Sequence, residues 1–528
     1  MSGGRPIGTG ATRRWLALSV LCVSLFAIVL DNTIVNVALP TLVRDLNADI
    51  SALQWVVDAY TLVFAGLLLL AGTLGDRYGR RRTLMIGLAV FGLSSAAAAF
   101  ANGVDQLVVA RAVMGAGAAF IMPATLSLLT HVFTDKRERA MAIGVWAATA
   151  GVGVALGPVL GGILLENFWW GAIFIVNVPV VAVALFAAPR LVPESRDSTK
   201  PRIDWLGAGL SGVGLIALVW AVIEAPSKGW GSPPVVGALV LAVAALGLFV
   251  AWQRRAPQPL LDVRLFRNSR FAAASLTIMV LFFALFGFLF LSTQYLQFVL
   301  GYSPSAAGLR MLPYALAMIV AAPLSARLTA RFGVRRIVTT GMLLFAAGLG
   351  IAATVTTGGG YGRLAIAMLA MGIGMGLAGT PATESIMSSV PPDRANVGSA
   401  VNDTTRELGG ALGVAIVGSI VSSLYGSRLD GTLPDGVPAP VEAAARESVG
   451  AAVQMTGELG TQVASAARDA FVHAMSRGTL VAAAMALVGA LIAWRFLPVP
   501  ERAPAPRAEK YGVDEHPRAE HEKEGAVR

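Results

Sequence analysis

The sequence predicts an all-α polytopic membrane protein, and three observations support that prediction. Hydrophobic residues fill 55% of the 528 positions and charged residues only 14%, whereas a soluble globular chain carries about 25% charged residues. Apolar runs of roughly 20 residues, each long enough to cross a hydrocarbon layer about 30 Å thick, recur along the chain. The alternating segments of about ten residues that a transmembrane β-barrel needs are absent from the sequence.

Fourteen apolar runs are predicted to be transmembrane helices, in a first six, an inserted pair and a second six. They cover 15–39, 52–74, 83–101, 107–130, 139–164 and 171–189; then 205–224 and 233–252; then 270–298, 305–326, 336–355, 362–388, 400–424 and 476–497. The domain organisation follows: a segment 1–14, an N-terminal six-helix bundle 15–190, two inserted helices 205–252, a C-terminal six-helix bundle 270–497 and a tail 498–528.

Arginine and lysine alternate between the connections, which predicts the topology because cytoplasmic loops carry the excess of these residues. One set of connections holds clusters such as Arg77 with 80–82, and the short connections of the other set hold only Arg44, Lys228 and Arg363. Both termini are therefore predicted to lie in the cytoplasm, with the protein in the inner or plasma membrane of the cell. This pattern also accounts for the net charge of +10 without nucleic acid as a partner.

Two stretches are predicted not to cross the membrane. The connection 425–475 is Ala-rich and amphipathic, and two interpretations stay open: a helical hairpin on the outer membrane surface, or a lid that gates the substrate. The charged, Pro-rich tail from Glu501 onward has almost no apolar content and is predicted to be disordered.

Several kinds of chemistry are not expected. The single cysteine, Cys22, excludes an intrachain disulfide and paired-thiol redox chemistry. The phosphate-binding loop of an ATP-driven pump, G-x-x-x-x-G-K-[ST], is missing from the sequence. Histidines occur only in loops, at span ends and in the tail, so we expect no metal site, no cofactor and no enzymatic activity.

An internal repeat divides the chain into two related halves. The stretch "GTLGDRYGRRRTLMIG" follows the second span, and "LSARLTARFGVRRIVTTG" follows the second span of the later block. Each has arginine, an aromatic residue, glycine and then further arginines. Two parallel six-span halves are typical of pseudo-symmetric transporters, and the inserted pair of spans then lies between the halves.

Four stretches resemble the major facilitator superfamily, and in particular its fourteen-span branch of drug:proton antiporters. They are "LDNTIVNVALP", "GTLGDRYGRRR", "RAVMGAGAA" and "GVGVALGPVLGG", in the first, second, fourth and fifth spans. The resemblance implies two six-helix bundles plus two inserted helices, and a monomer that exports amphiphilic drugs, dyes or metabolites in exchange for protons. A dedicated exporter of one antibiotic or lipid-like metabolite, a proton-coupled importer and a channel remain as alternatives.

The glycine- and arginine-rich loop is predicted to be a conformational latch. Its glycines allow close helix approach and a positive φ at a tight bend. An acid at the end of a span can face a helix N-terminus in the other half. By the resemblance, the latch of the outward-facing state comprises Gly72, Gly75, Asp76, Arg77, Gly79 and Arg80. The alternative is a simple cytoplasmic anchor, which is also the role expected for Arg81 and Arg82.

The fifth span carries the motif that the resemblance associates with exporters. Three glycines four residues apart lie on one helix face, and a proline among them loosens the backbone hydrogen bonding. The residues of this antiporter motif are Gly153, Gly157, Pro158, Gly161 and Gly162. Ordinary close packing of helices is the competing explanation.

Ionisable residues inside spans are candidates for proton coupling, because each costs at least about 2.5–3.5 kcal/mol at mid-helix. Asp31 and Asp58 lie at similar depths, about 12 Å and about 9 Å from the same side, and could share a proton. Their alternative is a capping or interface role beside Asn32, Asn36 or Tyr60. The full set of candidates is Asp31, Asp58, Arg111, Glu384, Asp403 and Glu407.

Two of these groups have a specific geometric expectation. Asp403 and Glu407 are four residues apart and so share a helix face, with Arg406 beside them; a surface ion-pair cluster is the alternative. Arg111 stays charged at physiological pH and, once buried, needs a carboxylate or several carbonyls. The resemblance assigns that arginine to proton transfer, and Arg310 has a similar place in the second half.

The ninth span, "FFALFGFLFLSTQYLQF", is the candidate substrate pocket. Its aromatic side chains recur on one helix face, and an amide and a phenol add polar groups. The residues proposed from this span are Phe286, Phe290, Gln294 and Tyr295. Packing against lipid is the alternative. Some dication exporters of the family that the chain resembles use an acid in the tenth span, and this span has none, so the resemblance argues against dications as substrates.

Overall fold

The structure is a computed structural model that describes residues 11–196, 203–390, 395–434, 437–455 and 457–498. The all-α prediction is confirmed, because these residues form helices and no strands. Fourteen helices in the described part of the chain are long and apolar enough to cross a membrane. The predicted disorder of the tail concerns residues outside this part.

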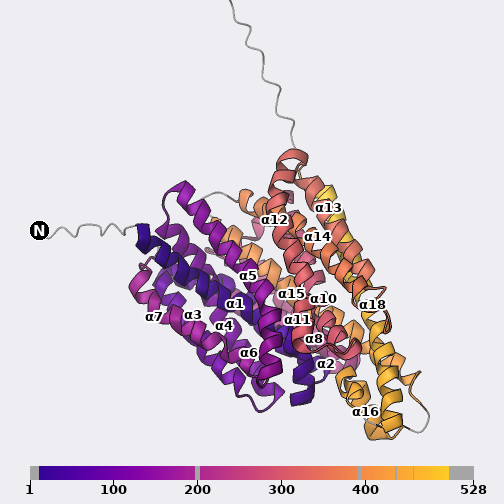
Figure 1. Ribbon diagram of the computed structural model, residues 1–528. Helices are drawn as coiled ribbons and strands as arrows, with labels where there is room; N and C mark the ends of the chain where they lie inside the picture. The colour runs from indigo at the N-terminus through magenta and orange to yellow at the C-terminus, as the bar shows by residue number, and fades with distance from the viewer. Residues whose placement is uncertain (1–10, 197–202, 391–394, 435–436, 456, 499–528) are drawn as a thin grey trace, which may run out of the picture.

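The first bundle contains the first six spans, and the sixth of them is broken into two helices. Their bounds are α1 Ala11–Leu46, α2 Ile50–Tyr78, α3 Arg80–Ala99, α4 Val104–Val132, α5 Lys136–Asn167, α6 Ala172–Ile175 and α7 Asn177–Leu191. Helix α1 packs against α5 and α7, and α4 packs against α2 and α3. Figure 1 shows this bundle as the indigo and magenta side of the molecule.

The second bundle has the same plan. After the inserted α8 (Trp205–Lys228) and α9 (Pro233–Gln253) come a 3₁₀ turn η1 (Val263–Arg267), α10 (Ser269–Gln294), a π-helical turn η2 (Tyr295–Val299), α11 (Pro304–Arg310), α12 (Leu312–Phe332), α13 (Val334–Ala352), α14 (Gly362–Ser388), α15 (Ala395–Asp430), α16 (Ala439–Glu447), α17 (Val449–Val453) and α18 (Gly457–Phe496). Inserted α8 packs against both α2 and α15, and so touches both bundles.

The connection predicted over 425–475 is much shorter than expected. Helix α15 continues to Asp430 and α18 already begins at Gly457, so only α16 and α17 remain between them. The stretch "ELGTQVASAARDAF" is rich in alanine, the strongest helix former, and it extends the last span as one continuous helix. The membrane-surface hairpin is therefore wrong for 457–475.

The predicted internal repeat is present in the backbone. Gly79 has φ 118° and Gly333, the equivalent glycine of the second loop, has φ 86°. Equivalent helix crossings also rest on glycine in both bundles: a Cβ at Gly117 would lie 2.7 Å from the Phe91 nitrogen, and one at Gly374 would lie 2.6 Å from the Phe345 nitrogen. The two bundles therefore share one packing scheme.

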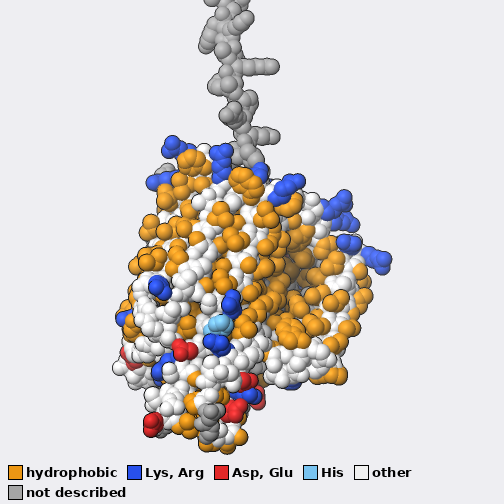
Figure 2. Space-filling view, turned by 90° about the vertical axis from the view of Figure 1, so that its right-hand side faces the viewer, with side chains coloured by type: hydrophobic (Ala, Val, Ile, Leu, Met, Phe, Trp, Pro, Cys, Tyr) orange, Lys and Arg blue, Asp and Glu red, His pale blue; other side chains and the backbone are white. Residues whose placement is uncertain are grey.

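The outer surface has the charge distribution of a membrane protein. Large apolar side chains such as Leu93, Phe186 and Val243 are at least 70% exposed. Figure 2 shows a wide hydrophobic belt, with lysine and arginine alone gathered at the upper end and acidic side chains mixed with further basic ones toward the lower end. We call these the arginine-rich end and the opposite end.

The bundles are joined by contacts toward the opposite end. Gln297 of the π-turn η2 donates to the Val37 carbonyl of α1 at 2.9 Å, and Gln54 of α2 donates to the Ala415 carbonyl of α15 at 2.9 Å. Gly162 of α5 lies directly against the backbone of Ser305 in α11. Toward the arginine-rich end, an open cavity of about 120 Å³ separates α2 and α4 from α15.

The glycine crossings predict the cost of adding one methyl group. Gly117→Ala and Gly374→Ala should each lower the free energy of unfolding by about 1–3 kcal/mol, because the new Cβ meets rigid backbone. Gly350→Ala is the control, since nothing lies within 4 Å of its Cβ position. Thermal unfolding in detergent measures the difference. Equal melting temperatures for all three variants would contradict the shared packing scheme.

Candidate functional site

A fully buried ion pair lies at the centre of the first bundle. Asp31 of α1 and Arg111 of α4 are 0% and 1% exposed, and Arg111 Nη1 lies 2.5 Å from Asp31 Oδ2. The prediction that a buried Arg111 needs a carboxylate is thereby met by Asp31. In a low-dielectric interior such a pair is stable only when further hydrogen bonds satisfy both partners.

Those further bonds come from three other helices. Arg111 Nε donates to the Val56 carbonyl of α2 at 3.0 Å, and its guanidinium lies 4.3 Å from the centre of the Tyr60 ring. The second oxygen of Asp31 accepts from Asn177 Nδ2 of α7 at 2.9 Å. Asn177 also reaches the hydroxyl of Ser95 on α3. Ser95 in turn donates to the Phe174 carbonyl of α6 at 2.8 Å. Each helix of the bundle except α5 thus supplies a group to this network.

Asp58 is buried in a different place from Asp31. Its side chain is 0% exposed, and neither carboxylate oxygen has a hydrogen-bond partner among the described residues. Gln54, one helical turn earlier on the same face, bonds to α15, so this face of α2 is turned toward the second bundle. Asp31 is turned toward α4 and α7 instead, and no hydrogen bond between described residues joins the two acids as the shared-proton interpretation requires.

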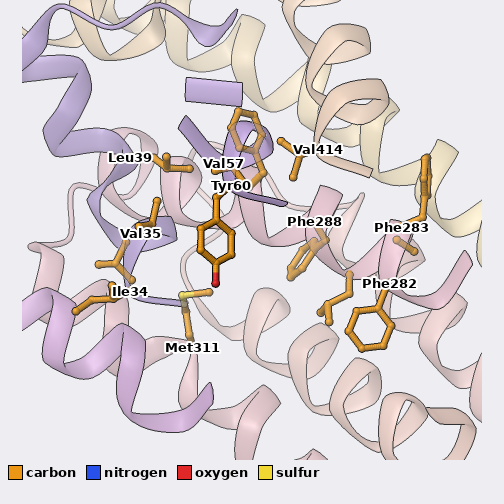
Figure 3. Packing of buried hydrophobic residues seen from close by; sticks show 14 of the residues in the cluster. Ile34, Val35, Leu39, Val57, Tyr60, Phe282, Phe283, Phe288, Met311 and Val414 are labelled. Atoms are coloured by element: carbon orange, nitrogen blue, oxygen red, sulfur yellow. The ribbon is translucent and has the colours of Figure 1, made fainter. Parts of the chain in front are cut away.

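Tyr60 lies between the ion pair and the second bundle. Its ring is stacked under Arg111, and its buried hydroxyl has no hydrogen-bond partner among the described residues. Figure 3 shows this hydroxyl pointing toward Met311 at the start of α12. Tyr60 therefore links the ion pair to the interface between the bundles.

The loop between α2 and α3 is fastened to its own bundle. Asp76 forms an ion pair with Arg80, with Nη2 2.7 Å from Oδ1. Arg80 also donates to Ser195, and the backbone nitrogen of Arg81 donates to Glu194 at 3.0 Å. The predicted contact of Asp76 with a helix N-terminus of the other bundle is not formed by the described residues in this conformation.

Asp76 nevertheless faces the second bundle across the open cavity. We call this space the arginine-end cavity; Gly72 and Asp76 of α2, Trp146 of α5, and Ser399 and Asp403 of α15 are among its lining residues. Two acids from different bundles thus line one space. Gly75 instead packs against Thr83 of α3, and Arg77 lies over the ring of Tyr78.

The acids of the second bundle differ in their surroundings. Asp403 is 14% exposed and lies 3.8 Å from Arg406, which in turn stacks on Phe282. The pairing of Asp403 with Arg406 is as expected, and Glu407 on the same helix is half-buried. Glu384 of α14 is exposed and lies outside the network of buried charges.

The small residues of α5 bring it into contact with two helices. Gly157 faces Thr33 and Gly161 faces Ile34, both on α1. Gly153 packs on Val29 of α1 in the same way. The opposite side of this stretch touches the second bundle, because the Pro158 carbonyl lies against Gly308 of α11. The residues of the antiporter motif thus pack against both α1 and α11.

A second cavity lies between the bundles, where α1 and α5 meet α10, α12 and α14. We call it the central cavity; it measures about 30 Å³, and Asn36, Pro158, Phe288, Tyr314 and Met368 are among its lining residues. Two groups from the ninth-span prediction are engaged elsewhere: Tyr295 donates to Thr356 and Gln294 donates to Phe290 within α10.

Phe286 and Phe290 do not line the central cavity either. Phe286 stacks on Phe282, and Phe290 is fully buried in the bundle core. The residues of the ninth span that do line this cavity are Phe288 and Leu289, and the substrate-pocket assignment of the other four stays a prediction. Arg310 is also not an equivalent of Arg111: it is only partly buried and lies 3.7 Å from the ring of Tyr302.

The family model described as "Major Facilitator Superfamily" matches residues 21–414. The chain belongs to that superfamily. The two bundles with an inserted pair of helices and the loop signature between α2 and α3 are the features that the sequence predicted for it.

Curated relatives match over almost the whole chain. "Multidrug efflux pump LfrA" of Mycolicibacterium smegmatis is 37% identical, covering 91% of this chain and 96% of the relative. "Methyl viologen resistance protein SmvA" of Salmonella typhimurium is 36% identical, covering 91% and 98%. "Tetracenomycin C resistance and export protein" of Streptomyces glaucescens is 34% identical, covering 91% of each.

Solved structures of the superfamily share the fold. A bacterial homologue of the human lysosomal transporter Spinster, in an inward-facing and unoccupied conformation, superposes with a TM-score of 0.63 at 18% identity, covering 94% of this chain and 100% of that one. The xylose transporter XylE from E. coli, in a partially occluded inward-open conformation, gives 0.57 at 14%, covering 93% and 99%.

The buried ion pair predicts an asymmetric response to substitution. Arg111→Met should lower the free energy of unfolding by about 3–5 kcal/mol, because Asp31 is left as an unpaired buried charge. Adding Asp31→Asn should restore most of this loss. Chemical or thermal unfolding in detergent measures both variants.

Arg446→Met provides the control for this measurement. Arg446 pairs with Asp430 at 2.6 Å, but both side chains are more than 40% exposed, so its loss should cost no more than about 1 kcal/mol. A double variant as unstable as Arg111→Met alone would show that the two buried charges do not depend on each other.

Proposed function

We propose that the protein is a proton-coupled exporter of amphiphilic drugs, dyes or secondary metabolites, working as a monomer by alternating access. The observation that supports this most is the buried pair of Asp31 and Arg111, in a chain whose relatives are named as efflux and resistance proteins. Ionisable groups inside spans are costly and are typically kept for function. A dedicated exporter of one antibiotic is the second candidate, since one relative is named for tetracenomycin C alone.

The proposed proton acceptor is Asp31. A proton on this carboxylate would remove the charge that holds Arg111, leaving the guanidinium with the Val56 carbonyl and the face of Tyr60. Because Asp31 is on α1 and Arg111 is on α4, loss of the pair frees α1 to move on the glycine face of α5. Four further acids remain candidate proton sites; from the most buried to the most exposed they are Asp58, Asp403, Glu407 and Glu384.

The proposed orientation places the arginine-rich end in the cytoplasm of a cell-membrane protein, with both termini on that side, because arginine and lysine gather there (Figure 2). The present conformation then opens toward the cytoplasm through the arginine-end cavity and is closed at the other end. The proposed domain division is the two bundles with α8 and α9 inserted between them.

The proposed latch works at the arginine-end cavity. In the present conformation Asp76 is held by Arg80 and lies across the cavity from Asp403. When the cytoplasmic end closes, Asp76 would meet the first turns of α15, whose free N–H groups attract a carboxylate. Gly72 on the cavity wall and the positive φ of Gly79 allow the close approach and the tight bend that this requires.

Transport by everted membrane vesicles tests the proposed coupling. Vesicles energised by respiration should accumulate ethidium, and a protonophore should abolish accumulation. Asp31→Asn should reduce the initial rate at least about tenfold. Asp45→Asn, an exposed acid at the far end of α1, should leave the rate unchanged.

The outcomes separate the candidates. Uphill transport that survives Asp31→Asn would refute Asp31 as the proton site. Dye movement without any gradient would favour a facilitator. No dye transport together with protection against a single antibiotic would favour the dedicated exporter.

Labelling from the cytoplasmic side tests the latch. Cys22→Ser removes the single cysteine, and Ala400→Cys places a thiol in the arginine-end cavity. Asp76→Asn should increase the rate of maleimide labelling about fivefold, because the closed state loses its latch. Asp45→Asn is again the control, and an unchanged rate with Asp76→Asn would contradict the latch.

A further inference from the structure

Two buried polar atoms at the central cavity have no hydrogen-bond partner in the described part of the chain. Asn36 is 3% exposed and Tyr314 is 6% exposed, and both line the cavity. The Asn36 carbonyl oxygen and the Tyr314 hydroxyl have no hydrogen-bond partner among the described residues. An unsatisfied buried polar group costs about 1–3 kcal/mol, so a ligand that bonds to these atoms would recover that cost.

The direction of the Asn36 amide defines what it can bind. Its nitrogen donates to the Asn32 carbonyl of the same helix at 3.0 Å, which leaves the side-chain oxygen as an acceptor at the cavity. A phenol hydroxyl both accepts and donates. The two atoms together therefore suit a ligand group with an N–H or O–H bond.

The remaining wall is apolar and contains no charged side chain among the residues that line it. Phe288 of α10, Met311 before α12 and Met368 of α14 are each less than 10% exposed. Methionine side chains are flexible and fill irregular shapes. The wall therefore favours the uncharged or charge-dispersed apolar body of a ligand, and specificity rests on the two polar atoms.

The repeat explains why the second bundle presents its tyrosine to the cavity. A Cβ at Gly115 would meet the Tyr60 carbonyl, and one at Gly372 would meet the Tyr314 carbonyl, so the two tyrosines occupy equivalent positions. In the first bundle the Tyr60 ring is covered by Arg111. In the second bundle the residue one turn before Gly372 is Met368, so helix α14 places no arginine over the Tyr314 ring.

We propose that Asn36 and Tyr314 are specificity-determining residues that bind an N–H or O–H donor group of the exported molecule, while Phe288, Met311 and Met368 contact its apolar part. This inference rests on the proposed export function and names the chemistry that the site selects. A cavity of about 30 Å³ has room for a small donor group, such as an amino or hydroxyl group, since about 10–15 Å³ on this measure is enough to hold one water molecule.

Binding to purified protein in lipid nanodiscs tests the proposal without any proton gradient. Ethidium and tetraphenylphosphonium are both monovalent apolar cations, but only ethidium has N–H donors. Tyr314→Phe and Asn36→Leu should each weaken ethidium binding about five- to tenfold. The affinity for tetraphenylphosphonium should change less than twofold.

Thr293→Val is the matched control. Thr293 is fully buried on α10 and its hydroxyl also lacks a partner among the described residues, but it does not line the central cavity. This variant should bind both cations as the wild type does. Because each variant is compared on two ligands, partial misfolding would weaken both and is distinguishable from lost recognition.

The results that would overturn the inference are specific. Equal weakening for the two cations, unchanged ethidium binding in both variants, or no binding of either cation by the wild type would each do so. A different outcome is that the variants weaken ethidium binding alone in nanodiscs while the vesicles show no gradient-driven transport. That outcome would support the recognition site and refute the proton-coupled export.

Discussion

The structure depends on keeping one ion pair inside an apolar bundle. Removing a carboxylate and a guanidinium from water costs several kcal/mol for each ion, and here four helices share the task of compensating that cost. Asp31 receives Arg111 and Asn177, while Arg111 also donates to Val56 and lies on Tyr60. The network fixes the relative positions of α1, α2, α4 and α7. It also makes their packing sensitive to the charge on Asp31, which a lipid-facing or solvent-facing acid would not do.

The two bundles show how one packing scheme can carry two tasks. Their glycine crossings, their positive-φ loop glycines and the tyrosines at 60 and 314 are equivalent. The difference lies in what surrounds each tyrosine: an arginine bound to an acid in the first bundle, and a methionine and a small cavity in the second. We infer that charge handling is concentrated in the first bundle and ligand contact in the second. The Tyr60 hydroxyl, directed at Met311 (Figure 3), lies between these two regions.

The fold was predictable because it depends on composition and spacing. Fourteen apolar runs and a repeated loop signature indicate two six-helix bundles with two inserted helices, and a buried Arg111 requires a carboxylate. What could not be predicted depends on helix rotation and on distant partners. Asn177 and Glu194 attract no notice in the sequence, since their roles arise only when α7 and the segment after it fold against α1 and the α2–α3 loop. The ninth span has many aromatic residues, so periodicity alone could not show that Phe288 is the one that lines the central cavity. The start of α18 was also missed, because its first turns are rich in alanine and polar residues and do not look like part of an apolar span.

The length of α18 has a consequence for how the protein can be reached. At 1.5 Å per residue, its 40 residues extend about 60 Å, twice the thickness of the hydrocarbon layer. The excess lies at the end away from the arginines, together with the end of α15 and the short α16 and α17. In the proposed orientation this is a firm helical projection outside the cell. An antibody fragment raised against it could hold the transporter rigid for imaging, or obstruct it, without ever entering the cytoplasm.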